Sequence, residues 1–237
     1  IQKTFDEYDI HYFIDERYDI SHNSLVRMLL SLLSILNSDS FYYHDVFEFL
    51  KTGYTPLTDE EINRLENYAL KYGIKRTEYL YEFKKADKKD EPVLAEINLI
   101  REKFAGIIRP LRQEIKSLKT YDAFAEFTEQ ILSDAEIQRK VDEDIKYCET
   151  NSLPVEKSIE EQIVDKIKEN LGFIKYFLKD QRASVEEFYE VFSQSLANDN
   201  AGILPVYSDC VMIGDFARSR TGKINAAIIL GAVEGNM

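Results

Sequence analysis

The sequence predicts a mainly α-helical protein with a small α/β part that is assembled from both ends of the chain. Short apolar and β-branched runs typical of strands occur only near the two ends, whereas the long stretch between them shows helical periodicity with clear caps. Hydrophobic residues make up 44% and charged residues 31% of the 237 residues, as in a globular protein with a core. We therefore expect an α/β part formed by residues 1–38 and 203–237, interrupted by a helical insertion of residues 39–202.

The first elements are a strand and a buried helix. His11-Tyr12-Phe13-Ile14 is a short aromatic and β-branched run that favours a strand. From about Ser24 to Leu36 a helix follows, and its apolar residues lie almost all round it, which predicts deep burial.

The next helices are marked by their caps. Thr58 and Glu61 have capping-box spacing, and Gly73 suits the C-terminal end of the same helix. From Val93 a long amphipathic helix is expected to kink at Pro110, which cannot donate a backbone hydrogen bond. Its apolar positions are 97, 100, 104, 107, 111, 115 and 118. Further helices are expected at about 121–132, 135–148, 159–179 and 185–196, the last two after capping boxes Ser158/Glu161 and Ser184/Glu187.

The C-terminal part changes in character. Val211–Ile213 and Ala226–Leu230 are uniformly apolar, the pattern of buried parallel strands. An inserted domain leaves and re-enters its host at neighbouring places, so we expect both runs to share a sheet with the strand at 11–14.

Charge and cysteine content restrict the class of protein. Lys and Arg number 30 against 43 Asp and Glu, giving a net charge of −13, which argues against a surface broadly committed to nucleic acid and leaves room for a local basic site. Cys148 and Cys210 have no metal-type spacing, and so few cysteines fit a reducing compartment such as the cytoplasm.

The most apolar run, Leu25–Leu36, is too short to span a bilayer and contains Arg27, so no membrane partner is expected. Because the chain begins without methionine and residues 228–237 read as a strand that leads onward, we expect a piece of a larger protein.

Three motifs resemble catalytic or metal sites and fail on spacing. Arg220-Thr221-Gly222-Lys223 resembles the end of a phosphate-binding loop, but the first glycine is misplaced and no helix is expected to follow. Glu114-Ile115-Lys116 and Asp144-Ile145-Lys146 match part of a nuclease motif, yet residues two apart on a helix point in different directions. The histidines lie at no metal-ligand spacing and are interpreted as structural or surface residues: His11, His22 and His44.

One small basic turn remains as a candidate site. Arg218, Ser219, Arg220 and Lys223 lie between two predicted buried strands, where open α/β sheets bind ligands. Two arginines and a hydroxyl there suit phosphate oxygens. The residues alone leave a second interpretation open, a solvated turn with local salt bridges.

Three segments, in order, resemble one family, the B subunit of the bacterial ATP-dependent helicase/nuclease AddAB, called RexAB in some Gram-positive bacteria. The middle segment is the most specific match. The segments are residues 9–15 with 21–25, residues 45–53 with 61–68 and 72–75, and residues 213–220 with 226–231 and 234–235.

This resemblance implies a superfamily 1 helicase fold, in which a RecA-like motor domain called 2A carries a helical insertion called 2B. For the parent protein it implies double-strand break processing and recombinational repair with DNA and a partner A subunit. It also implies ATP, Mg²⁺ and an iron–sulfur cluster, none of which is expected in this part. The segment at 213–220 takes the place of helicase motif V but departs from its pattern at Asp215 and Ala217.

The sequence therefore predicts a noncatalytic 2A/2B piece of an AddB-like subunit that serves DNA guidance and subunit contact. We expect no catalytic residue, metal site or cofactor in this chain, and DNA-phosphate contacts only at the basic turn. The alternative is a helical protein-interaction module unrelated to DNA. A third hypothesis is an autonomous enzyme with a site of another kind.

Overall fold

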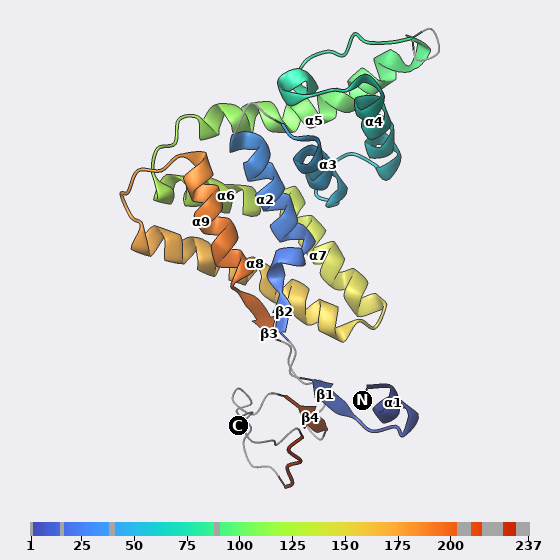
Figure 1. Cartoon of the computed structure of the whole chain (residues 1–237), viewed down its shortest axis with the longest axis vertical. Coiled ribbons are helices and arrows are strands. Elements are labelled where there is room, and N and C mark those ends of the chain that lie inside the picture. The colour runs from blue at the N-terminus through green and yellow to red at the C-terminus, as the bar shows by residue number, and fades with distance from the viewer. Residues whose placement is uncertain are drawn as a thin grey trace. The chain divides into compact units, whose positions relative to one another are not determined.

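The computed structural model describes residues 2–14, 17–37, 41–87, 91–202, 210–214 and 225–230. The chain divides into two compact units, one formed by Ile1–Glu16 with Ile203–Met237 and the other by Arg17–Gly202. The helices and strands shown in Figure 1 are α1 (Gln2–Glu7), β1 (Tyr12–Ile14), β2 (Arg17–Asp19), η1 (Ile20–His22), α2 (Ser24–Asn37), α3 (Tyr43–Lys51), α4 (Asp59–Tyr72), η2 (Arg76–Leu80), η3 (Glu91–Val93), α5 (Leu94–Ile115), α6 (Tyr121–Leu132), α7 (Ala135–Thr150), α8 (Pro154–Phe177), α9 (Val185–Ala197), β3 (Asn200–Gly202) and β4 (Val211–Ile213).

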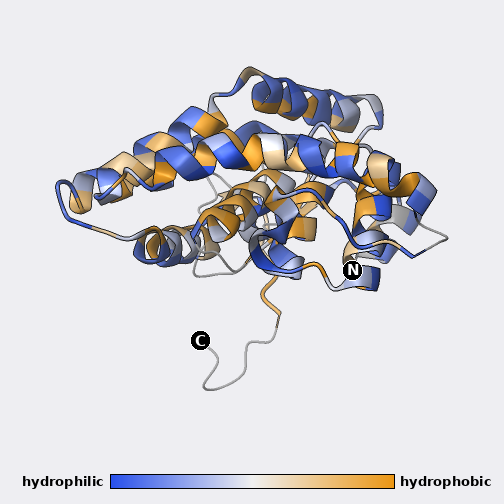
Figure 2. Ribbon diagram, turned by 90° about the horizontal axis from the view of Figure 1, so that it is seen from above, coloured by the Kyte–Doolittle hydropathy of each residue, from blue (hydrophilic) through white to orange (hydrophobic). Residues whose placement is uncertain are grey.

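Helix α2 forms the centre of the helical unit. It packs against α3, α5 and α9, and most of its side chains are buried, as its apolar surface predicts. Asn23 caps its N-terminus, because the Asn23 Oδ1 atom accepts a 2.8 Å hydrogen bond from the Leu25 amide. Figure 2 shows hydrophobic and hydrophilic residues alternating along the other helices of this unit, and each of these helices contributes buried residues to the core. No helix among the described residues is long and apolar enough to cross a bilayer.

Two of the three predicted capping boxes are confirmed. Thr58 and Glu61 cap α4, which ends at Gly73 with a left-handed φ of 60°, and Ser184 and Glu187 cap α9. The box predicted at Ser158 is wrong. Helix α8 already starts at Pro154, where proline needs no amide partner, so Ser158 lies inside the first turns.

The long helix α5 is confirmed, and it runs through Pro110 to Ile115. The predicted apolar face is buried at four of its positions, Ile97, Ile100, Phe104 and Ile115. Phe104 lies at the centre of an aromatic group, with ring centroids 6.4 Å from Phe49 and 6.2 Å from Tyr79. These contacts fix α5 against α3 and η2.

The two ends of the helical unit are paired. β2 and β3 form an antiparallel ladder in which Arg17 faces Gly202 and Asp19 faces Asn200. Gln162 of α8 secures it, since its Nε2 atom donates a 2.8 Å hydrogen bond to the Gly202 carbonyl. The chain therefore enters and leaves this unit at neighbouring places.

The small unit contains the predicted parallel pairing. β1 and β4 pair in parallel, with Tyr12 opposite Val211 and Ile14 opposite Ile213, so the shared sheet of 11–14 and 211–213 is confirmed. The third predicted strand is wrong, because Ala226–Leu230 is exposed and lies in no strand. β4 is also more exposed than a buried strand, since the described sheet has two strands of three residues each.

Helix α2 belongs to the helical unit, which begins at Arg17, whereas the predicted domain bounds assign residues 1–38 to the α/β part. The apolar residues of α2 are buried against α3, α5 and α9. Those domain bounds stay a prediction.

Candidate functional site

The predicted basic turn lies outside the described residues. Arg218, Ser219, Arg220 and Lys223 all fall within the stretch 215–224, so phosphate contact by this turn stays a prediction. Its neighbours Val211–Ile213 are placed, in β4.

The other sequence motifs are structural in the described part of the chain. Among those residues no group of three or more His, Cys, Asp or Glu side chains is arranged to hold a metal ion. Asp144 forms an ion pair with Lys140, one turn away on α7, and not with Lys146. His44 contacts Glu48 at 2.8 Å on the exposed side of α3. Burial raises the pKa of the Cys148 thiol, so this cysteine is a poor nucleophile.

A second candidate, which the sequence analysis missed, is the segment of residues 75–87 between α4 and α5. It consists of η2 followed by an extended stretch that has no strand partner among the residues that the structure describes. Side chains from α4 and α5 take the place of that partner. The Tyr68 hydroxyl donates a 2.6 Å hydrogen bond to the Lys85 carbonyl, and the Tyr72 hydroxyl accepts one of 2.9 Å from the Asp87 amide.

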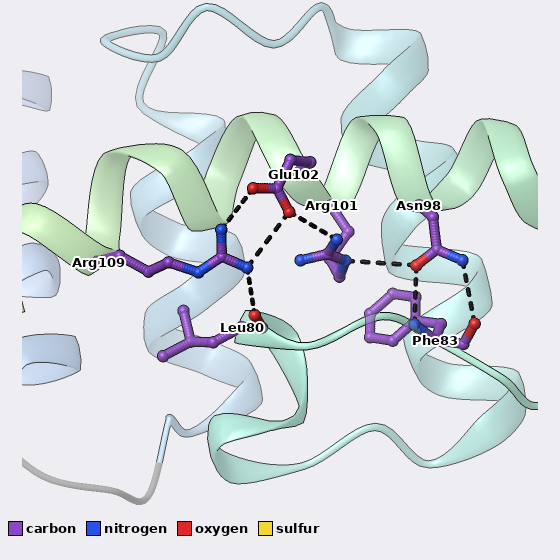
Figure 3. Close-up of polar contacts among 6 residues, drawn as sticks. All are labelled: Leu80, Phe83, Asn98, Arg101, Glu102 and Arg109. Atoms are coloured by element: carbon purple, nitrogen blue, oxygen red, sulfur yellow. Dashed lines mark hydrogen bonds and ion pairs between the residues drawn. The ribbon is translucent and has the colours of Figure 1, made fainter.

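Helix α5 holds the same segment from the other side (Figure 3). The Asn98 side chain bonds both backbone groups of Phe83: its Oδ1 accepts from the amide at 2.7 Å and its Nδ2 donates to the carbonyl at 3.0 Å. Arg109 donates to the Leu80 carbonyl. Because a backbone N–H or C=O group that is shielded from water is costly when it has no hydrogen-bond partner, these contacts explain how an irregular stretch keeps one conformation.

The side chains of Asn98 and Arg109 together act as a clamp on the backbone of this segment, and Arg101 and Glu102 orient that clamp. The Arg101 side chain donates from Nε to Asn98 Oδ1 at 3.3 Å and from Nη2 to Glu102 at 2.7 Å. The pKa of the Glu102 carboxyl lies below its ordinary value, because Arg109 and Arg101 donate hydrogen bonds to it. Arg101 is only 5% exposed, and its Nη1 atom has no hydrogen-bond partner among the described residues.

The clamp fixes which side chains of the segment face solvent. Phe83 points inward, with its ring stacked 4.8 Å from Tyr68. Tyr81 is 68% exposed, and Lys75, Arg76 and Lys84 are exposed as well. A recess of about 290 Å³ lies here, lined by Ile74, Thr77, Glu78, Tyr81, Glu82, Phe83, Lys84 and Lys85.

Exposed aromatic side chains also gather near the end of α8. Phe173, Tyr176 and Phe177 are each more than half exposed, and Tyr176 packs against Phe177 with ring centroids 5.0 Å apart. Lys175 lies between them in the sequence but points to α6, where it forms an ion pair with Glu129. This cluster is an apolar patch on a surface that is otherwise rich in charge.

A local signal for the segment at 75–87 was present in the sequence. Two pairs of basic residues, at 75–76 and 84–85, flank an aromatic run there, in a protein that is strongly acidic. The sequence did not show which residues hold this segment in place, because Asn98, Arg101 and Arg109 read as ordinary polar positions of an amphipathic helix.

The comparison with curated proteins identifies one class of relatives. No protein-family profile matches the chain. Over nearly its whole length, however, the chain is homologous to one segment of a helicase and nuclease subunit, and the predicted resemblance is confirmed. The chain spans about a fifth of the length of the curated relatives it matches.

The relatives are named as the B subunit of an ATP-dependent helicase/deoxyribonuclease. The protein of Alkaliphilus oremlandii is 29% identical over 248 residues, covering 99% of this chain and 22% of the relative. That of Alkaliphilus metalliredigens is 28% identical over 250 residues, again with 99% and 22% covered. That of Clostridium botulinum strain Hall is 30% identical over 246 residues, with 99% and 21% covered.

Proposed function

We propose that this chain is a noncatalytic segment of a helicase/deoxyribonuclease B subunit and contributes DNA guidance and subunit contact during double-strand break processing. The observation that carries the proposal is the similarity over 99% of the chain to proteins of that name. The relatives' names include a helicase and a deoxyribonuclease activity, which we assign to the complete subunit and its partner.

The architecture supports a 2A-like part that carries a 2B-like insertion. β1 and β4 come from opposite ends of the chain and pair in parallel, as in a RecA-like sheet. The β2–β3 ladder brings the two ends of the helical unit together. In this proposal, Arg218, Ser219, Arg220 and Lys223 contact DNA phosphates, and ATP, Mg²⁺ and an iron–sulfur cluster are held by other parts of the complex.

The first experiment tests the absence of catalysis. We expect the purified chain to hydrolyse neither ATP nor DNA, since no phosphate-binding loop occurs in the sequence. Nuclease activity that survives rigorous purification and disappears with a point mutation in this chain would contradict the proposal.

The second experiment tests DNA guidance. Fluorescence anisotropy with forked DNA should show weak, salt-sensitive binding, because a net charge of −13 opposes approach. The double variant Arg218→Ala/Arg220→Ala should weaken binding about equally for all DNA sequences, since phosphate contacts carry no base information. Loss of binding to one sequence only would mean that the turn reads bases.

The third experiment tests subunit contact. Aromatic side chains are enriched at protein interfaces, and the exposed cluster on α8 supports this part of the proposal. In the complete subunit, the double variant Tyr176→Ala/Phe177→Ala should reduce co-purification with the A subunit. The control variant Leu99→Ala, at an exposed position of α5, should not. If the aromatic double variant co-purifies normally, this cluster is not the contact.

The same cluster is the observation that favours the alternative function, a helical protein-interaction module unrelated to DNA. The two functions differ in one result. A module of that kind would bind a protein partner and show no DNA binding at low salt, with or without Arg218 and Arg220.

A further inference from the structure

We propose that the tip of the helical unit formed by Lys75, Arg76, Tyr81 and Lys84 binds single-stranded nucleic acid. The cations would contact phosphates, and one base would stack on the exposed Tyr81 ring. This inference deepens the proposed function, because it assigns a nucleic-acid contact to a surface far along the chain from the basic turn at 218–223.

The positive charge at this tip is available. Lys75, Arg76 and Lys84 are exposed, and none of them forms an ion pair with a residue that the structure describes. The nearby carboxylate of Glu78 is already engaged, with Oε2 accepting from the Lys75 amide at 2.8 Å and Oε1 lying 3.6 Å from Lys85 Nζ. Glu78 and Glu82 both line the recess, and Glu82 is the one that forms no ion pair with a described residue, so its carboxylate is the stronger opponent of an anion here.

The aromatic part distinguishes a nucleic acid from other anions. Tyr81 is 68% exposed although it adjoins a well-packed group, with Tyr79 fully buried on one side and Phe83 almost fully buried on the other. Single strands expose the faces of their bases, which stack on aromatic side chains without regard to sequence, while duplexes keep those faces covered. An acidic peptide would use the cations but not the ring.

The tip is also held ready for binding. Asn98, Arg109, Tyr68 and Tyr72 fix the backbone of residues 80–87 at five atoms, and Arg76 has a left-handed φ of 53°. A non-glycine residue in that conformation is strained and is found where the surrounding structure enforces it. Because the backbone is ordered before the ligand arrives, binding loses little conformational entropy there.

The experiment measures binding of fluorescein-labelled oligo-dT and of a labelled duplex to the whole chain by anisotropy, at several salt concentrations. Arg76→Gln/Lys84→Gln should weaken oligo-dT binding and flatten the slope of log K against log salt by about 1.4, since each contact contributes about 0.7 for single strands. Lys146→Gln/Lys168→Gln is the control, because it removes the same charge from exposed positions on α7 and α8.

The ring is tested separately. Tyr81→Ala should weaken oligo-dT binding at least about fivefold and leave duplex binding unchanged, whereas Tyr81→Phe should keep the affinity, because stacking needs only the ring. Glu82→Gln should strengthen binding by removing the opposing charge.

Several results would overturn the inference. These are the absence of oligo-dT binding at low salt, an equal effect of the control pair, or a Tyr81→Ala variant that binds normally. Stronger binding of a poly-glutamate peptide than of oligo-dT would identify an acidic protein as the partner instead. Since Arg218→Ala/Arg220→Ala is measured in parallel, a failure of the tip is distinguishable from a failure of the basic turn.

Discussion

Replacing Asn98 with alanine tests the clamp on which the exposed tip depends. The change removes two hydrogen bonds at once, because the same side chain accepts from the Phe83 amide and donates to the Phe83 carbonyl. Phe83 as a whole residue is only 4% exposed, so water reaches its backbone groups poorly after the change. Arg101 Nε also loses its acceptor, Asn98 Oδ1, so it becomes the third group that the change leaves unsatisfied, after the two backbone groups of Phe83. Arg101 Nη1 already lacks a partner among the described residues.

The magnitude follows from the number of groups left without partners. An unsatisfied buried donor or acceptor costs about 1–3 kcal/mol, and the bonds to Phe83 are partly buried, so we take the lower part of that range for each. The free energy of unfolding should therefore fall by about 2–3 kcal/mol. For a domain of this size that corresponds to a decrease in Tm of roughly 4–12 °C.

The assay combines urea unfolding with native-state hydrogen exchange. Tyrosine fluorescence reports unfolding, since the chain has 15 tyrosines and no tryptophan. The exchange rate of the Phe83 amide should rise more than that of amides in α2, because the local bond is lost in addition to global stability. Leu99→Ala is the control, as Leu99 is the next residue on α5 and is exposed. If Asn98→Ala is no more destabilising than Leu99→Ala and Phe83 stays protected, the clamp does not hold this segment.

Three further predictions concern other buried groups. Arg101→Met should change the free energy of unfolding by no more than about 1 kcal/mol, because methionine fills the buried site while the half-exposed Glu102 keeps Arg109 and is not left as a buried unpaired charge. A loss above about 3 kcal/mol by chemical denaturation would contradict this. Phe104→Ala should cost about 3–5 kcal/mol, since the ring is fully buried between Phe49 and Tyr79, and a calorimetric loss below about 1 kcal/mol would refute that packing. Burial raises the pKa of the Glu160 carboxyl in the folded state, so its contribution to stability falls as pH rises from the ordinary carboxyl value through the raised one. Glu160→Gln should therefore be more stable than the natural chain at pH 7 and lose this advantage at acid pH, and a pH-independent difference in urea midpoints would contradict the assignment.

Several elements were predictable because their signals are local. The caps of α4 and α9 depend on residues three apart, so Thr58, Glu61, Ser184 and Glu187 identify them without any tertiary information. The buried face of α5 follows from helical periodicity in the same way. The start of α8 was misjudged because two start signals compete there, and Pro154 precedes the box at Ser158.

Composition and motifs also carried part of the functional interpretation. The missing phosphate-binding loop and the spacing of the acidic and lysine residues argue against those two kinds of catalytic site, and three separated segments identified the relatives. The basic turn at 218–223 was proposed on the same local grounds and stays a prediction.

Only the tertiary structure decided the rest, because it depends on contacts between residues far apart in the chain. Strand pairing is of this kind: β2 and β3 are three residues each, too short to show a period, and they exist because residues 17–19 and 200–202 meet. An apolar run such as Ala226–Leu230 reads as a strand, yet it is not one in the structure, and it pairs with no strand among the described residues. The clamp follows the same rule, since the extended stretch around Phe83 has no sequence signature of order and acquires its conformation from Asn98 and Arg109 on a different helix.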